Sequence, residues 1–247
     1  MEFCEKLIML GTGHATVTEC YNACFVLRTS ESALLVDGGG GNGILKQMKK
    51  AEIHLTELTN IFVTHTHIDH LFGIVWILRM MGEKMTDKNS THNCTVYSHN
   101  KVLKVIKYLC RNTLSPITWN NIQEKVKFQK VYDTQSVEIG ENMSLQFFDM
   151  ESCTETQYGF KACLSSGKTL VCLGDALYQE QLVSYVQDAD WLICESFCRD
   201  YDKEKFHPHE LHHNTVLDVA IIAQQLDVKN LVLYLSLIHI SEPTRPY

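Results

Sequence analysis

The sequence predicts an α/β fold of two β-sheets whose outer faces are covered by helices. Short apolar runs typical of buried strands recur along the chain, few helices separate the early ones, and helix–strand pairs follow a strand-rich middle. With 247 residues, 45% of them hydrophobic, the chain is long enough for one two-layered domain or two small ones. Since no repeat or low-complexity linker divides it, we expect one domain over residues 1–234.

Strands are expected where an apolar run lies between turn residues, and several of these runs end at a Gly, Asp or His. The expected strands are Leu7–Leu10, Ala23–Leu27, Ala33–Val36, Ile61–Val63, Thr95–Ser98, Leu145–Asp149, Gly159–Leu164, Thr169–Leu173, Trp191–Cys194 and Leu231–Tyr234. The expected helices are Gly43–Ala51, Leu71–Met81, Lys101–Arg111, Tyr178–Gln187 and Thr215–Leu226, with a loop over Gly82–Asn93. The last helix has apolar residues at close to a 3.6-residue period.

The most informative segment follows the apolar run Ile61–Val63, which is typical of a buried strand. It holds four side chains able to bind a metal: His65, His67, Asp69 and His70. The first two histidines lie two residues apart, so on extended backbone they project to the same side. The aspartate and the last histidine fall at the start of the next helix. This order predicts that the first pair binds one metal and the second pair binds a neighbouring metal.

Three further residues could take part in the chemistry. Asp175 follows the run Leu170–Leu173 through one glycine, so it is either a bridging carboxylate or the cap of a following helix. Glu195 ends a strand-like run and His213 precedes the last helix. A carboxylate beside a histidine fixes its tautomer and raises its basicity. The alternative is that the first merely caps and the second merely starts a helix.

The H-x-H-x-D-H pattern of residues 65–70 resembles the signature of the metallo-β-lactamase superfamily, and its surroundings are most similar to the ribonuclease Z-like branch. The resemblance runs over roughly residues 5–234 and includes Leu10–Gly13, Leu35–Gly39, Gly174–Asp175 and His213–Thr215. It implies an αββα sandwich, truncated at its C-terminus, with the metal site at one edge between the sheets. It also implies two divalent metal ions, in the first place Zn²⁺, with Mn²⁺ or Fe as alternatives.

The resemblance implies roles for single residues. Asp69 would be both a ligand and the proton acceptor from the bridging water, and Asp175 would bridge the metals. Glu195 and His213 would pair, so that the histidine donates a proton to the departing oxygen. Asp37 would hydrogen-bond a ligand histidine.

Two positions depart from the family pattern. Most members have a histidine after the strand that reads Gln146–Asp149 here, but this chain continues with Glu151, either an oxygen ligand or an exposed surface glutamate. Leu235 stands where the family has its last histidine ligand, and His239 comes four residues late. Residues 235–247 look like a translated sequencing adapter, and we expect an artefactual tail and a weakly held second metal.

The composition and charge of the chain limit the classes of partner and the location that we expect. The formal net charge is −7, and one helix face carries basic residues (Lys101, Lys104, Lys107, Arg111) that we expect to be merely solvated. The ten cysteines form no C-x-x-C pair, which favours buried free thiols. No apolar run is long enough to span a membrane, and no signal peptide is apparent, so a cytoplasmic protein is expected. The sequence leaves open whether the protein forms a homodimer.

These observations favour a metal-dependent hydrolase, a ribonuclease Z-like phosphodiesterase or endoribonuclease that cuts precursor tRNA at its 3′ side through a metal-bridging hydroxide. The acidic charge counts against tRNA, and so does the lack of a Gly/Pro-rich arm between Asp175 and His213. The alternatives are a hydrolase of a small phosphodiester such as a cyclic nucleotide, of a thioester or of a lactone, and a degenerate, non-catalytic metal-binding protein.

Overall fold

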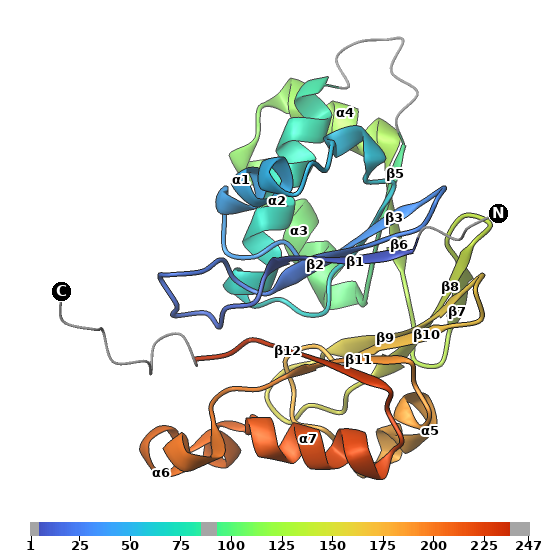
Figure 1. Ribbon diagram of the computed structural model, residues 1–247. Coiled ribbons are helices and arrows are strands. Elements are labelled where there is room, and N and C mark those ends of the chain that lie inside the picture. Colours follow the sequence, from blue (N-terminus) through green and yellow to red (C-terminus); the bar gives the residue numbers. More distant parts are fainter. Residues whose placement is uncertain (1–4, 85–92, 238–247) are drawn as a thin grey trace.

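The computed structural model describes residues 5–84 and 93–237, which form two six-stranded sheets packed face to face (Figure 1). In spatial order, the first sheet contains β1 (Lys6–Gly11), β2 (Cys24–Arg28), β3 (Ala33–Val36), β4 (Asn60–Phe62), β5 (Cys94–Ser98) and β6 (Val126–Lys130). The second contains β12 (Asn230–Tyr234), β11 (Trp191–Glu195), β10 (Thr169–Cys172), β9 (Tyr158–Leu164), β8 (Met143–Asp149) and β7 (Ser136–Glu138).

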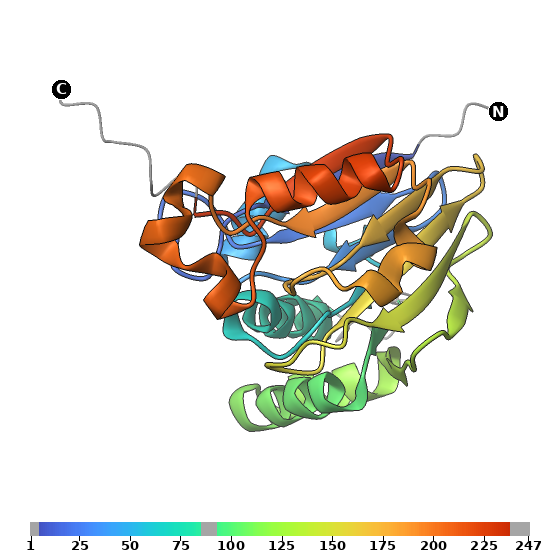
Figure 2. The ribbon, with the colours of Figure 1, turned by 90° about the horizontal axis from the view of Figure 1, so that it is seen from below.

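Helices cover the outer face of each sheet. On the first sheet they are α1 (Gly43–Lys50), α2 (Ile68–Lys84), α3 (Asn100–Thr113) and α4 (Pro116–Lys125). On the second they are α5 (Val183–Val186) and α7 (Val216–Gln225), which runs along the sheet in Figure 2. The short α6 (Lys203–Phe206) and the 3₁₀ turns η1 (Leu55–Glu57), η2 (Glu180–Leu182), η3 (Asp200–Asp202) and η4 (Pro208–Leu211) lie in connections. This is the expected αββα sandwich.

Each sheet is part antiparallel and part parallel. Strands β1 to β3 pair antiparallel, whereas β3 to β6 pair parallel. In the second sheet β7 to β10 are antiparallel and β10 to β12 are parallel. A parallel connection needs a crossover, which is why helices follow the parallel strands. The carboxyl ends of these parallel strands supply the candidate site.

The main core lies between the two sheets. Phe62 from β4 meets Phe147 from β8 and Phe160 from β9 with ring centroids 5.1 and 5.5 Å apart. All three side chains are fully buried. Aromatic contacts of this kind add about 0.5–1.5 kcal/mol per pair to the free energy of burial. They lock the two sheets together next to the loop that carries His65.

The sequence-based prediction does not include three elements of the middle region, which are α4, β6 and β7. Helix α4 begins at Pro116 behind the cap Ser115, whose hydroxyl accepts from the amide of Thr118 at 3.2 Å. The sequence does not predict this helix, because polar residues interrupt the helical spacing of its apolar residues. The expected helix Tyr178–Gln187 is shorter than predicted, reduced to η2 and α5. Of the expected loop Gly82–Asn93, residues 82–84 belong to α2, and 85–92 lie outside the described residues.

Residues 235–237 pack against the domain. Leu235 and Leu237 are 1% and 6% exposed, and Ser236 forms a parallel bridge with Gly13. The rest of the expected tail, 238–247, lies outside the described residues. Nine cysteines in the described ranges are free thiols. No helix within those ranges is long and apolar enough to cross a membrane.

A pair of glycines fixes the start of α2 against the loop after β3. A Cβ on Gly73 would come within 1.7 Å of the carbonyl oxygen of Gly38. This close approach allows the Gly73 amide to donate to Gly39 at 2.8 Å and the Gly38 amide to donate to His70 at 2.7 Å. Because Asp37 and His70 sit on these two segments, the approach sets their relative position.

We therefore expect Gly73→Ala to lower the free energy of unfolding by about 1–3 kcal/mol, the usual cost of an overpacked contact. Urea denaturation measures this. The control is Gly41→Ala, since a Cβ at Gly41 meets no atom within 4 Å. Equal stabilities of the two variants would show that the helix start can shift freely.

Candidate metal centre

The loops that follow β3, β4, β10 and β11 meet at one edge of the sandwich, between the sheets. These loops and the elements next to them carry the residues that the sequence singled out: Asp37, His65, His67, Asp69, His70, Asp175 and Glu195. Asp69 and His70 lie in the first turn of α2, as expected. His213 joins them from the segment just before α7.

The first group consists of His65, His67 and Asp175. Each offers one ligand atom, and these atoms lie within 4.8 Å of one another. The rings of His65 and His67 have centroids 4.4 Å apart. His65 Nε2 lies 3.9 Å from Asp175 Oδ2. The structure thus brings Asp175 next to His65 and His67, the pair proposed for the first metal.

Asp175 also faces the second pair. His70 Nε2 lies 3.7 Å from Asp175 Oδ2 and 3.6 Å from Asp69 Oδ2. One carboxylate oxygen is thus within 4 Å of His65 on one side and of His70 on the other. This is the position that a bridging carboxylate requires. No helix begins at Ala176, so the capping alternative for Asp175 fails.

The donor set fits divalent metal ions. His65 Nε2, His70 Nε2 and Asp175 Oδ1 are buried and have no hydrogen-bond partner among the described residues. Buried polar atoms are normally satisfied, and leaving them unpaired costs about 1–3 kcal/mol each. Unpartnered atoms on neighbouring side chains of one cluster are consistent with a ligand that supplies the missing bonds. Imidazole and carboxylate donors suit zinc, manganese or iron.

Asp37 contacts the His70 ring at Nδ1, on the side opposite the Nε2 atom that faces Asp175. Asp37 Oδ2 lies 2.7 Å from His70 Nδ1, and the amide and hydroxyl of Thr64 donate to the two Asp37 oxygens at 2.9 Å. Burial alone would lower the pKa of His70, but the Asp37 carboxylate outweighs burial and raises that pKa to about 9. Burial, with the neighbouring His70 ring, lowers the pKa of His65 well below its ordinary value.

At pH 7 the metal-free His70 therefore holds a proton that a metal must displace, whereas His65 does not. Below a pKa of about 9 the imidazole is protonated and competes, and above it the competition ends. We expect zinc affinity to rise about tenfold from pH 7 to pH 8 and to level off above that pKa. Competition with a chelator of known pH dependence measures this.

The variant Asp37→Asn should shift the pH dependence to lower pH, because the carboxylate no longer stabilises the imidazolium. An affinity that does not change between pH 7 and pH 8 in the unaltered protein would contradict this account of His70.

Gln157 was not singled out by the sequence. Its amide nitrogen donates to the backbone oxygen of Asp175 at 2.8 Å, and its amide oxygen accepts from the Asp175 backbone nitrogen at 3.2 Å. The Gln157 side chain is buried, and Gly174 next to Asp175 has φ +68°. These two hydrogen bonds fix the backbone of Asp175. A single sequence gives no signal for such a contact.

The second constellation is formed by Glu195, His213 and Asp175. His213 Nδ1 lies 3.5 Å from Glu195 Oε2 and 3.5 Å from Asp175 Oδ1. Its ring stacks on Phe197 with centroids 4.7 Å apart and an interplanar angle of 5°. The other Glu195 oxygen accepts from the backbone and side-chain nitrogens of Asn214, both at 2.6 Å.

These contacts set the charge of His213. Burial lowers its pKa, but the Glu195 and Asp175 carboxylates outweigh burial and raise it above its ordinary value. Burial raises the pKa of Glu195. A histidine with a raised pKa next to the ligand cluster is a candidate proton donor. The same three side chains also form a second group able to hold a metal.

Glu151 lies apart from these groups. Its side chain is exposed and accepts from Gln181 Nε2 at 2.7 Å. The nearer acid is Glu155 in the same loop, whose Oε2 lies 3.3 Å from His67 Nε2. The basic residues of α3 were expected to be merely solvated. Lys101 is an exception, because it donates to Glu155 at 2.8 Å.

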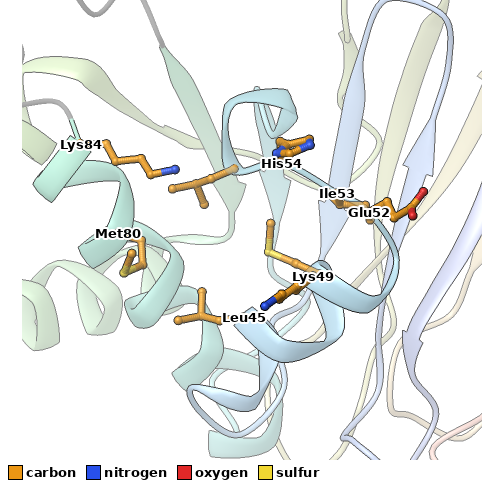
Figure 3. A pocket seen from close by; sticks show the side chains of 9 residues that line it. Leu45, Lys49, Glu52, Ile53, His54, Met80 and Lys84 are labelled. Carbon is orange, nitrogen blue, oxygen red and sulfur yellow. The ribbon is translucent and has the colours of Figure 1, made fainter.

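His14, which the sequence left without a role, packs edge-on against Phe197 and His213 with ring centroids 4.9 and 6.1 Å apart. A cavity of about 630 Å³ lies elsewhere, between α1, η1 and the end of α2 (Figure 3). Its wall residue Met80 stands ten positions along α2 from His70. At 1.5 Å per residue this is about 15 Å, so the cavity is separate from the ligand cluster.

The fold and the ligand cluster define a metal-dependent hydrolase of the metallo-β-lactamase superfamily, in its ribonuclease Z-like branch. The family model described as "Anti-Pycsar protein Apyc1" matches residues 5–225, and the chain belongs to this family.

Similar proteins agree with this assignment. The ribonuclease Z of Nitrosopumilus maritimus (strain SCM1) is 23% identical over 272 residues, 92% of this chain and 88% of that protein. The anti-Pycsar protein Apyc1 of Bacillus phage BSP38 is 29% identical over 134 residues, 53% of this chain and 45% of that protein. The short form of human tRNase Z superposes with a TM-score of 0.75 at 22% identity, over 93% of this chain and 92% of that chain.

Proposed function

We propose that the protein is a metal-dependent phosphodiesterase. The observation that carries the proposal is the position of Asp175 Oδ2, within 4 Å of both His65 Nε2 and His70 Nε2. His65, His67 and Asp175 would hold one metal, and Asp69, His70 and Asp175 the other. Divalent metals in such a site lower the pKa of water toward neutrality and stabilise negative charge on a phosphoryl group.

The chain's own residues supply proton transfer and orientation. Asp69 would accept a proton from the attacking water, because its carboxylate faces the cluster beside His70. His213, whose pKa is raised by Glu195 and Asp175, would give a proton to the departing oxygen. The stack on Phe197 fixes the plane of the His213 ring, so the proton is delivered in one direction.

Two substrate classes are candidates. The similarity to ribonuclease Z proteins supports a precursor tRNA cut at its 3′ side, and with that substrate the protein would be a tRNA-processing endonuclease. The net charge of −7 and the missing arm between Asp175 and His213 favour a small phosphodiester such as a cyclic nucleotide. The basic face of α3 also favours the small substrate, because two of its lysines already have partners within the protein. Lys101 is paired with Glu155, and Lys107 lies 4.8 Å over the Phe128 ring.

The test has two stages. With zinc or manganese supplied, the protein should hydrolyse bis(p-nitrophenyl) phosphate and leave a thioester untouched. Cyclic nucleotides and a tRNA with a 3′ extension are then compared at equal concentration. Cleavage of the thioester alone would contradict the phosphodiesterase proposal, and metal binding without any hydrolysis would favour the non-catalytic alternative.

A separate prediction concerns Leu235. This residue follows the end of β12, next to the strand that ends at Glu195, and has φ +57°. Histidine adopts such backbone more readily than leucine. We expect Leu235→His to strengthen binding of the second zinc ion about tenfold or more, because a ligand is added. Calorimetric titration measures the second binding step. An unchanged second step would show that position 235 does not face the metal.

A further inference from the structure

The outer partners of the three cluster histidines differ in one respect. His65 Nδ1 lies 2.9 Å from the hydroxyl of Thr64, and His70 Nδ1 lies 2.7 Å from Asp37. Both rings therefore leave Nε2 facing the cluster, where it is buried and without a hydrogen-bond partner among the described residues. In His67 the order is reversed, because Nε2 is the atom that meets an outer carboxylate, that of Glu155.

Glu155 is held firmly in this place. One oxygen, Oε1, accepts from Lys101 Nζ at 2.8 Å and from the hydroxyl of Thr66, while Oε2 faces His67. The Glu155 side chain is 8% exposed. The loop between β8 and β9 thus presents the Glu155 carboxylate to one edge of the His67 ring.

The contacts argue against Glu155 as a direct ligand. The group of metal-binding atoms within 4.8 Å of one another contains His65, His67 and Asp175, and among the described residues it does not extend to Glu155. Glu155 thus contacts His67 without belonging to that group. Ligand histidines commonly donate their second ring N–H to a carboxylate, which fixes the tautomer and the ring orientation.

We propose that Glu155 is a positioning residue for His67: its carboxylate accepts the Nε2 proton of that ring and so leaves Nδ1 to face the metal. His67 has particular need of such a partner, because its side chain is 49% exposed whereas His65 and His70 are fully buried. Lys101 and Thr66 keep the carboxylate aimed at the ring. The inference rests on the metal centre of the proposed function and not on the reaction.

The test measures zinc affinity, with zinc alone as the probe, in competition with a chelator. Glu155→Gln keeps the size of the side chain and removes its charge, and should weaken zinc binding about 10–100-fold without changing the number of ions bound. Glu151→Gln, in the same loop but bonded to Gln181, is the matched control and should stay within about twofold of the unaltered protein. Lys101→Met should weaken binding less than Glu155→Gln.

A second readout does not depend on any variant. Long-range ¹H–¹⁵N spectra of the zinc-loaded protein should show His67 with a proton on Nε2 and the metal on Nδ1. The opposite tautomer would overturn the proposal, as would a Glu155→Gln variant with unchanged affinity or one that loses a whole equivalent of zinc. An unaltered protein that binds no zinc would overturn the proposed function first, and this inference with it.

Discussion

Asp175→Asn should abolish turnover, by a factor on the order of 10³ or more, and should weaken both metals together. The side chain keeps its size, and the two Gln157 hydrogen bonds hold only the backbone of Asp175, so the fold should persist. What is lost is the one negative charge that faces both His65 and His70. A loss of several kcal/mol of charge stabilisation corresponds to this factor, since each 1.36 kcal/mol is tenfold.

The measurement is a steady-state rate on a phosphodiester together with zinc stoichiometry by elemental analysis. The control is Asp227→Asn, because Asp227 has φ +51° after α7, a backbone conformation that asparagine also tolerates, and lies outside the ligand groups. If Asp175→Asn released only one of two ions and kept its rate, Asp175 would not be the bridging group.

His213→Ala has the second largest expected effect, a fall in turnover on the order of 10² or more, since it removes the proposed proton donor. The loss should fall on kcat, while zinc binding stays close to that of the unaltered protein. A phosphodiester with a good leaving group, such as p-nitrophenolate, needs less help from an acid, so the variant should lose less activity on it.

This comparison of leaving groups separates two roles, because His213 Nδ1 also lies 3.5 Å from Asp175 Oδ1, within a group that could hold a metal. A His213→Ala protein that loses a zinc equivalent, with equal rate losses on both leaving groups, would make His213 a ligand. A variant with normal turnover on both would remove either role.

Much of this architecture could be predicted because it depends on local patterns. Ten expected strands have counterparts among the twelve observed, since an apolar run between turn residues is visible in the chain itself. The cluster at residues 65–70 was also visible, because its ligands follow one another along one strand end. The convergence of Asp175 on both histidine pairs depended on a resemblance, since sequence spacing alone left a capping role open.

The remainder depends on contacts between segments far apart in the sequence. Glu155 meets His67, and Gln157 holds Asp175, through the fold of the loop between β8 and β9. The family resemblance drew attention to Glu151, either as an oxygen ligand or as a surface glutamate, because most members have a histidine after this strand. In the structure Glu151 has φ +50° and its side chain is exposed. Four residues further on, the same loop presents Glu155 instead. A loop conformation of this kind leaves no periodic pattern in the sequence from which it could be predicted.

The most direct test of the metal centre is zinc binding to the purified protein after removal of bound metal, followed by calorimetry. The account predicts at least about one tightly held zinc ion per chain, with a weaker second ion, and loss of the tight site in His65→Ala. A protein that takes up no zinc, manganese or iron, or that binds zinc equally well without His65, would contradict it.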